Sequence, residues 1–100
     1  MDDIVLSVRD ESEQGRLVAD VEGHEAELVY TIRPDAFVIV HVGTPKHLEG
    51  RGIGGAMVRA GVRYARERGL AVVPQCPFAE SWLERNPDVA STVEVRPGRS

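Results

Sequence analysis

The sequence has a single cysteine, Cys76, and therefore cannot form an intramolecular disulfide. A lone cysteine is typical of proteins from reducing compartments, so we expect a cytoplasmic location. Long hydrophobic runs are missing too, because none approaches the ~18–20 apolar residues that a membrane-spanning helix needs. The start, Met1-Asp2-Asp3, is acidic where a secretory leader would be basic. We therefore expect no disulfide framework, no membrane partner and no leader.

Positive charge is also scarce, with 12 Lys and Arg residues against 16 Asp and Glu residues. The net charge of −4 argues against a nucleic-acid partner, which usually requires a basic face. Basic residues gather only in the middle of the chain, at Arg51, Arg59, Arg63, Arg66 and Arg68. This segment could attract an anionic ligand, and a solvated helix face is the alternative for its last four arginines.

Length and composition indicate one folded unit. A chain of 100 residues with 42% hydrophobic residues suits a single domain, which we expect over 1–95, with a frayed tail at 96–100. The three histidines and the cysteine do not have the spacing of metal ligands, so no metal site is predicted.

Alternating apolar and polar residues predict antiparallel strands over the first forty positions. The first three runs begin at Ile4, Leu17 and Ala26, and turn-forming residues separate them at 12–15, 22–23 and 33–35. The fourth run, 36–42, is apolar on both faces, which is typical of a central strand covered on both sides. The short connections predict a meander of four antiparallel strands.

A helical period then replaces the alternation. Apolar residues recur at helical spacing from Ile53 to Tyr64, and Gly69 ends the predicted helix. A short apolar run at 70–73 predicts a fifth strand, parallel to the fourth because a helical crossover joins them. Pro77 opens a second predicted helix over 76–85, and a further turn follows Asp88. The fold class is therefore α+β.

Four glycines stand together at the start of the long helix, at Gly50, Gly52, Gly54 and Gly55. The first N–H groups of a helix have no intrahelical partner, and the helix dipole adds partial positive charge there. Glycines let a phosphate approach such a backbone closely, so the cluster predicts an anion site, with a purely structural helix cap as the alternative.

Two common phosphate loops do not fit this cluster. Three of its glycines satisfy G-x-G-x-x-G, but a dinucleotide fold needs that motif directly after a strand. A Walker A loop would end in Gly-Lys-Ser/Thr, whereas here Gly55 is followed by Ala56.

The order of meander, x-x-Gly-x-Gly loop, helix and parallel strand resembles the GNAT superfamily of acyl-CoA-dependent N-acetyltransferases. The family motif Arg/Gln-x-x-Gly-x-Gly/Ala is matched at Gly52 and Gly54, with Glu49 in place of its first residue. The segments Thr44-Pro45 and Pro74-Gln75-Cys76-Pro77 further resemble a compact subgroup of that superfamily, and the resemblance covers roughly 4–88.

The resemblance implies a site for acetyl-CoA as co-substrate. Strands four and five would part at their C-terminal ends, and the pantetheine arm of coenzyme A would pair with the backbone of strand four. The backbone positions implied for the arm are Ile39, Val40 and Val42; those implied for the diphosphate are Arg51, Gly52, Ile53, Gly54 and Gly55. Glu49 is expected to point away, and Arg51 to supply the local positive charge.

Cys76 and His41 are the candidate catalytic residues. The N-terminus of a helix lowers the pKa of a thiol, so Cys76 could accept the acyl group or protonate coenzyme A. A small buried hydrophobic residue is the alternative. His41 is the candidate general base, because an imidazole titrates near neutral pH, and a hydrogen-bonded core histidine is its alternative.

The predicted function is transfer of an acetyl group to an amine. A turn replaces the two helices that wall the acceptor site in typical relatives, so the acceptor could be a peptide or a protein. The alternatives are a non-catalytic coenzyme A-binding module and an interaction domain without a small ligand. Phe78 and Trp82, four residues apart on one helix face, are expected in the core, with a wall of the substrate site as the alternative.

Overall fold

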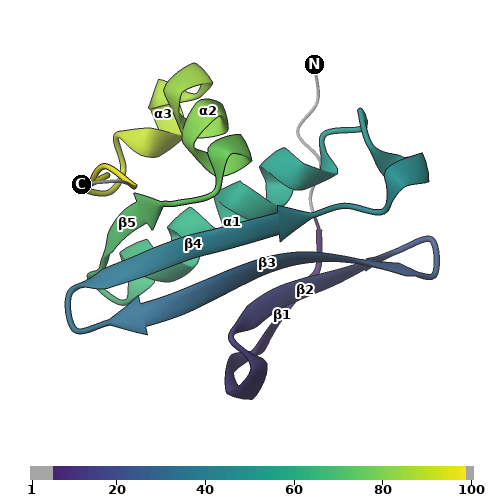
Figure 1. The fold of residues 1–100 in the computed structure, drawn as a ribbon, viewed down its shortest axis with the longest axis horizontal. Helices are drawn as coiled ribbons and strands as arrows, with labels where there is room; N and C mark the ends of the chain where they lie inside the picture. The colour runs from purple at the N-terminus through teal and green to yellow at the C-terminus, as the bar shows by residue number, and fades with distance from the viewer. Residues whose placement is uncertain (1–5, 99–100) are drawn as a thin grey trace.

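The computed structural model describes residues 6–98 and contains one five-stranded sheet in the order β1-β2-β3-β4-β5 (Figure 1). The strands are β1 (Val8–Glu11), β2 (Arg16–Val21), β3 (His24–Arg33), β4 (Ala36–Gly43) and β5 (Ala71–Pro74). The first four strands pair antiparallel, and β5 runs parallel to β4. The predicted α+β topology is confirmed; the expected start of the first strand, Ile4, lies outside the described residues.

The helices follow the predicted order. They are α1 (Ile53–Glu67), α2 (Pro77–Arg85) and α3 (Pro87–Ala90), with 3-10 turns η1 (Ser12–Gln14) and η2 (Lys46–Leu48). Pro77 and Pro87 each open a helix, where the missing N–H of proline costs nothing. Gly69 follows α1 in the left-handed conformation, with φ of 68°. Within residues 6–98, no helix combines the length and hydrophobicity needed to cross a membrane.

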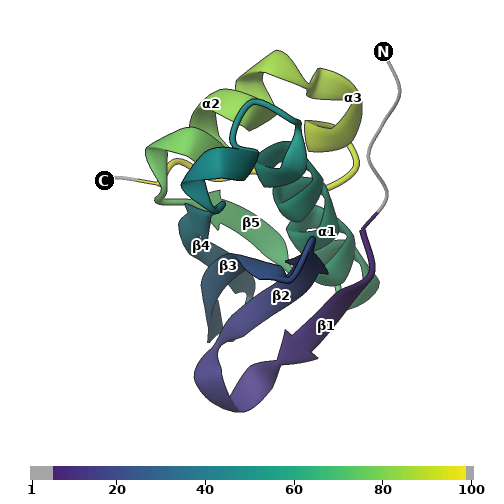
Figure 2. The same ribbon diagram turned by 90° about the vertical axis from the view of Figure 1, so that its right-hand side faces the viewer.

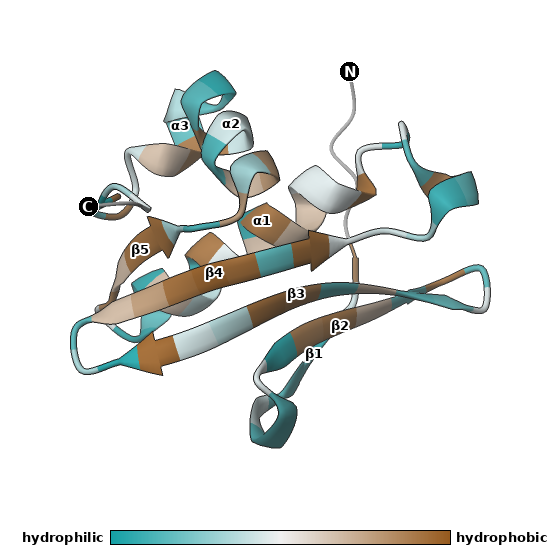
Figure 3. Ribbon diagram, viewed as in Figure 1, coloured by the Kyte–Doolittle hydropathy of each residue, from teal (hydrophilic) through white to brown (hydrophobic). Residues whose placement is uncertain are grey.

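Helices α1 and α2 pack on one face of the sheet and α3 packs against both of them, and this covered face holds the main core (Figure 2). The hydrophobic colouring runs through most of β4 and β5, while the hairpin ends are hydrophilic (Figure 3). Phe37 and Leu28 are fully buried there. A side chain at Gly61 would come within 2.9 Å of Leu28 Cδ1, so glycine at this position lets α1 lie close to the sheet.

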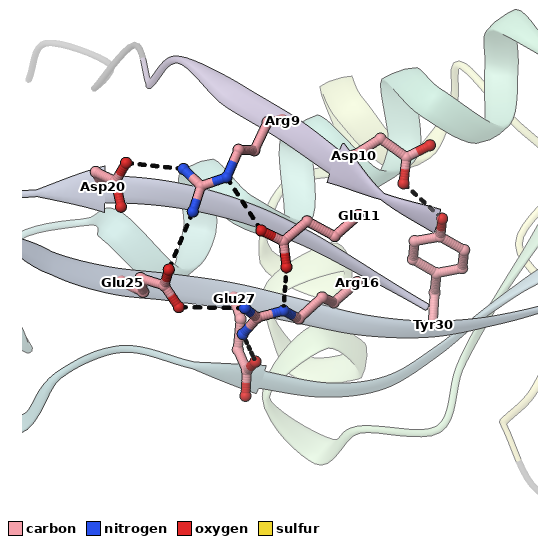
Figure 4. Close-up of polar contacts among 8 residues, drawn as sticks. All are labelled: Arg9, Asp10, Glu11, Arg16, Asp20, Glu25, Glu27 and Tyr30. Carbon is pink, nitrogen blue, oxygen red and sulfur yellow. Dashed lines mark hydrogen bonds and ion pairs between the residues drawn. The ribbon is translucent and has the colours of Figure 1, made fainter. Parts of the chain in front are cut away.

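The opposite, open face of the sheet carries a network of ion pairs over β1, β2 and β3 (Figure 4). Arg9 and Arg16 each contact three carboxylates at 2.7–3.3 Å; the acids are Glu11, Asp20, Glu25 and Glu27. The hydrogen bond from Arg16, followed by that from Arg9, lowers the pKa of the Glu11 carboxyl group. Charge pairs thus line this face over β1 to β3, whereas Ala36, Val38 and Val73 form a second, smaller buried cluster on β4 and β5.

Asp10 joins β1 to the covered face through two tyrosines. The Tyr30 hydroxyl donates to Asp10 Oδ1 at 2.6 Å, and the Tyr64 hydroxyl donates to Oδ2 at 2.9 Å. Tyr30 is only 6% exposed and stacks on Phe37, with ring centroids 4.9 Å apart. Burial, followed by the hydrogen bond to Asp10, raises the pKa of the Tyr30 phenol above its ordinary value.

The C-terminal segment covers the outer edge of β5. The Val72 N–H donates to the Glu94 carbonyl at 2.8 Å, and the Arg96 N–H donates to the Val72 carbonyl at 2.9 Å. The Arg96 guanidinium also pairs with Asp35 at 2.8 Å. Arg96, which we expected in a frayed tail, is therefore held against the sheet, while Arg99 and Ser100 lie outside the described residues.

Candidate functional site

β4 changes its pairing at Val40. Tyr30 lies opposite Ile39, but the preceding residue of β3, Val29, lies opposite His41. Val40 is therefore an extra residue, a β-bulge, which the continuous apolar run of this strand did not predict. A bulge bends its strand and commonly lies beside a functional site.

The pairing between β4 and β5 also ends here. The last pair joins Ile39 to Pro74. The N–H groups of Gln75 and Cys76 then both donate to the Ile39 carbonyl, at 3.0 and 3.1 Å. The remaining residues of β4, from Val40 onward, lie beyond the last pair with β5. The two strands thus part at the position where the pantetheine arm was expected.

A cleft of about 620 Å³ lies where this end of β4 meets the starts of α1 and α2. It is lined by Val42 of β4, by Thr44, Leu48, Glu49, Gly50 and Gly52 of the following loop, by Ile53, Gly54 and Gly55 of α1, and by Phe78, Trp82 and Arg85 of α2. Five of the predicted cofactor-binding residues, Val42 and 52–55, are among them. Ile39, Val40 and Arg51 are not in this lining.

Two of the clustered glycines shape the loop itself. Gly50 and Gly52 have φ angles of 83° and 82°, in the left-handed region that side chains rarely adopt. Gly52 is the N-cap of α1, and its carbonyl accepts the N–H of Ala56 at 3.0 Å. The N–H groups of the first helical turn therefore lie at the cleft without intrahelical partners, which is the geometry of an anion site.

The other two glycines allow α2 to dock on α1. A side chain at Gly55 would collide with Trp82 Nε1, and one at Gly54 would lie 2.9 Å from Phe78 Cζ. The structural alternative for the glycine cluster therefore applies to these two positions, and most strictly to Gly55, because the Trp82 indole packs directly against it whereas the exposed Phe78 ring can move. Gly50 and Gly52 are instead required by the left-handed conformation of the backbone at these positions.

Phe78 and Trp82 form an apolar wall of the cleft. We expected both in the core, but Phe78 is 42% exposed and both residues line the cleft. The Arg59 guanidinium carbon lies 5.5 Å from the centre of the Trp82 ring, within reach of a cation–π interaction. The spacing of four residues predicted a shared face correctly, but it did not say which neighbour that face meets.

The charges of the loop differ from the prediction. Arg51 does not line the cleft, since its Nη2 pairs with Glu22 Oε2 of the β2–β3 turn at 2.6 Å. This contact lowers the pKa of the Glu22 carboxyl group. Glu49, which we expected to point away, is part of the cleft wall. The positively charged side chain that lines the cleft is that of Arg85 in α2. We did not single out this residue from the sequence.

Cys76 lies at the parting of β4 and β5 but inside the main core. It is the N-cap of α2, is 7% exposed, and its carbonyl accepts the Glu80 N–H at 3.0 Å. Its side chain belongs to the core cluster and not to the cleft lining. The position at a helix N-terminus agrees with the prediction, whereas the burial matches the hydrophobic alternative.

The histidines lie away from the cleft. His41 is exposed on the open face, where its Nε2 lies 3.1 Å from the point that a Cβ of Gly43 would occupy. His24 and His47 contact each other edge to face, with ring centroids 4.5 Å apart. Over residues 6–98, no three His, Cys, Asp or Glu side chains are grouped as a metal site would require.

Comparison with known proteins finds a matching family and similar solved structures. A family model described as GCN5-related N-acetyl-transferase matches residues 16–92. Among solved structures, the NMR solution structure of a GCN5-like protein from Staphylococcus aureus is similar, with 26% sequence identity and a TM-score of 0.69. That match covers 91% of this chain and 90% of the other. No curated protein matches the chain.

Proposed function

Because the chain belongs to the GCN5-related N-acetyltransferase family, we propose that it binds acetyl-CoA in the cleft between α1 and α2 and transfers the acetyl group to an amine. The observation that carries this proposal is the left-handed Gly52, which opens α1 at the cleft next to the parting of β4 and β5. An anion site and an unpaired strand end thus lie side by side, as a ligand with a diphosphate and an amide-bearing arm requires.

Each part of the ligand has a matching surface. The backbone N–H groups at 51–55 bind the diphosphate, where the helix dipole favours negative charge. The pantetheine arm lies along β4 at Ile39, Val40 and Val42 and bonds to the strand as an added strand would. Phe78 and Trp82 cover its apolar portion.

The transfer step requires two proton movements. The amine nitrogen bonds to the acetyl carbon, the carbon–sulfur bond breaks, the amine loses a proton and the coenzyme A thiolate gains one. The Val42 N–H polarises the thioester carbonyl, as backbone donors do for a developing oxyanion. Cys76 donates the proton to sulfur or carries the acetyl group in a covalent intermediate. His41 takes up the amine proton through water around the end of β4, since its ring lies on the open face.

Binding can be tested with the single tryptophan of the chain, Trp82, which lines the cleft. Titration with coenzyme A should change its fluorescence in a saturable manner. Gly52→Ala should weaken binding at least about tenfold, because the added Cβ distorts the loop. Gly69→Ala is the matched control, since it strains a left-handed glycine at the far end of α1. Unchanged fluorescence together with no heat in calorimetry would refute the proposal.

The second candidate function is coenzyme A binding without catalysis. It is favoured by the burial of Cys76 and the placement of His41 on the open face. Mass spectrometry after incubation with labelled acetyl-CoA and a panel of amines and peptides separates the two functions. Transfer to Cys76 or to an added acceptor supports the enzyme, while binding without transfer supports the module. Cys76→Ser and Cys76→Ala then distinguish a thiol that carries the acetyl group from one that donates a proton.

A further inference from the structure

The loop contributes no positively charged side chain to the lining of the cleft within residues 6–98, since Lys46 and Arg51 both lie outside it. Arg51 is paired with Glu22 at 2.6 Å, outside the cleft wall. Glu49 adds a negative charge within that wall. The whole chain carries a net charge of −4, which also disfavours an anionic ligand. A ligand with several phosphate groups therefore needs a cation from another element.

We propose that Arg85 of α2 supplies that charge and binds a phosphate group of the acyl-CoA ligand; this rests on the proposed function. Phe78, Trp82 and Arg85 follow one another at intervals of four and three residues, so they share one face of α2. All three line the cleft. The same helix face that provides the apolar wall thus ends in a cation.

Over the described part of the chain, the Arg85 guanidinium forms no ion pair with a carboxylate. Its Nη1 donates to the Ser81 hydroxyl, a neutral partner one turn earlier in α2. A hydroxyl fixes the direction of the guanidinium group without neutralising it, whereas the carboxylate of Glu22 neutralises Arg51. The planar guanidinium then presents its remaining N–H groups as a fork, a geometry that matches two oxygens of one phosphate.

The position along α2 assigns Arg85 to the phosphate end of the ligand. The helix starts at Cys76, whose N–H binds the Ile39 carbonyl where β4 and β5 part. Arg85 is the last residue of the helix. Nine helical residues span about 13 Å, so Arg85 lies far from the acetyl group and close to the nucleotide end.

Binding of three ligands to matched variants tests the assignment. Coenzyme A, dephospho-coenzyme A and pantetheine are titrated into wild-type protein, Arg85→Gln and Arg63→Gln, with Trp82 fluorescence as the readout. Arg85→Gln should weaken coenzyme A binding about tenfold and leave pantetheine binding unchanged. Its affinity should also depend less steeply on salt concentration, because one ionic contact is lost. Arg63→Gln, at an exposed arginine of α1 outside the cleft lining, should change the affinity less than about twofold.

The ligand series also tells which phosphate Arg85 contacts. A loss confined to coenzyme A identifies the 3′-phosphate, and an equal loss for dephospho-coenzyme A identifies the diphosphate. Arg85→Lys should restore part of the affinity, since it keeps the charge but not the fork. Circular dichroism melts check that each variant is folded.

The assignment is overturned if Arg85→Gln binds coenzyme A as wild type does, or if it loses pantetheine binding equally. Wild-type protein that binds none of the three ligands would instead refute the proposed function, and the assignment of Arg85 with it. The two failures are thus distinguished by the wild-type titration alone.

Discussion

The two faces of the sheet are built from different interactions. The covered face packs Phe37, Leu28 and Ile39 against helices and leaves them without exposure. On the open face, Arg9 and Arg16 hold four carboxylates in water-accessible ion pairs. Burial of apolar area contributes far more free energy than exposed ion pairs do. We infer that the covered face contributes most of the stability, while the open face presents charged side chains to water over β1, β2 and β3.

The candidate site lies on the rim of the covered face. Its walls, Val42, Gly55 and Trp82, are continuous with the core of that face, but the cleft they enclose opens to solvent. The packed core of the covered face thus supports the walls of the site, as a precise binding geometry requires. The four predictions that follow probe the contrast between the faces, beginning with the core.

Phe37→Ala should have the largest effect. Phe37 is fully buried and its ring contacts those of Tyr30 and Tyr64, at 4.9 and 5.3 Å between centroids. Loss of such a side chain leaves a cavity and should lower the free energy of unfolding by about 3–5 kcal/mol, measured by urea denaturation. Thr31→Ala on the open face is the control and should change it by less than about 0.5 kcal/mol. Equal losses of unfolding free energy in Phe37→Ala and Thr31→Ala would contradict the distinction between the two faces.

Gly55→Ala should come next. Its Cβ would collide with the Trp82 indole, so α2 must shift and the free energy of unfolding should fall by about 1–3 kcal/mol. Gly54→Ala is the matched control. Its Cβ meets the tip of Phe78, which is 42% exposed and can move away. The better helix propensity of alanine, up to about 1 kcal/mol, should then make Gly54→Ala nearly neutral. If Gly54→Ala lowered the free energy of unfolding more than Gly55→Ala does, the Phe78 ring, and not the Trp82 ring, would be the one that cannot move.

Tyr30→Phe should change the alkaline limb of the stability curve. The pKa of Tyr30 is raised in the folded protein, so the fold keeps a proton that the unfolded chain loses above pH 10. The free energy of unfolding of wild-type protein should therefore decrease as the pH rises beyond 10. In Tyr30→Phe, denaturation curves between pH 8 and about 11 should show a flatter dependence. An unchanged slope would mean that the phenol titrates alike in both states.

Glu11→Gln should have the smallest effect, confined to acid. Arg16 and Arg9 lower the pKa of Glu11 in the folded protein, so its contribution is present above pH 4.5 and is lost as the pH falls below it. The variant should lose a small part of its stability at neutral pH and show a shallower acid limb, and added salt should reduce both differences. Glu13→Gln, at an exposed acid in η1, serves as the control. A steeper acid limb in Glu11→Gln would contradict the expected sign.

The strand and helix order could be predicted because each element has its own periodicity. Alternation marks β2 and β3: every second residue enters the covered face, from Leu17 to Ala19 and from Ala26 to Tyr30. The parallel pairing of β4 and β5 followed from the handedness of the helical crossover. The N-cap role of Gly52 followed from the clustered glycines. Glycine destabilises the interior of a helix, so a cluster of glycines indicates a special backbone conformation at its start.

The details of the cleft could not be predicted for equally physical reasons. In the run 36–42, residues on both faces of the strand are apolar, so the pattern does not indicate that Val40 is the extra residue of a bulge. The shared face of Phe78 and Trp82 is equally compatible with a core and with a cleft wall. Arg51 and Arg85 are both arginines near a helix end; their roles separate only when Glu22 and Ser81 are brought to them by the fold.

The extra residue at Val40 has a consequence for how this chain can vary in length. If the same residues paired without a bulge, His41 would stand opposite Leu28, and an imidazole would enter the dry interior while Val42 turned to water. Deleting Val40 itself would instead remove the bulge and leave His41 opposite Val29 and Val42 opposite Leu28. The strand can therefore lose one residue at this point and keep every later side chain on its present face, whereas a second deletion would invert them.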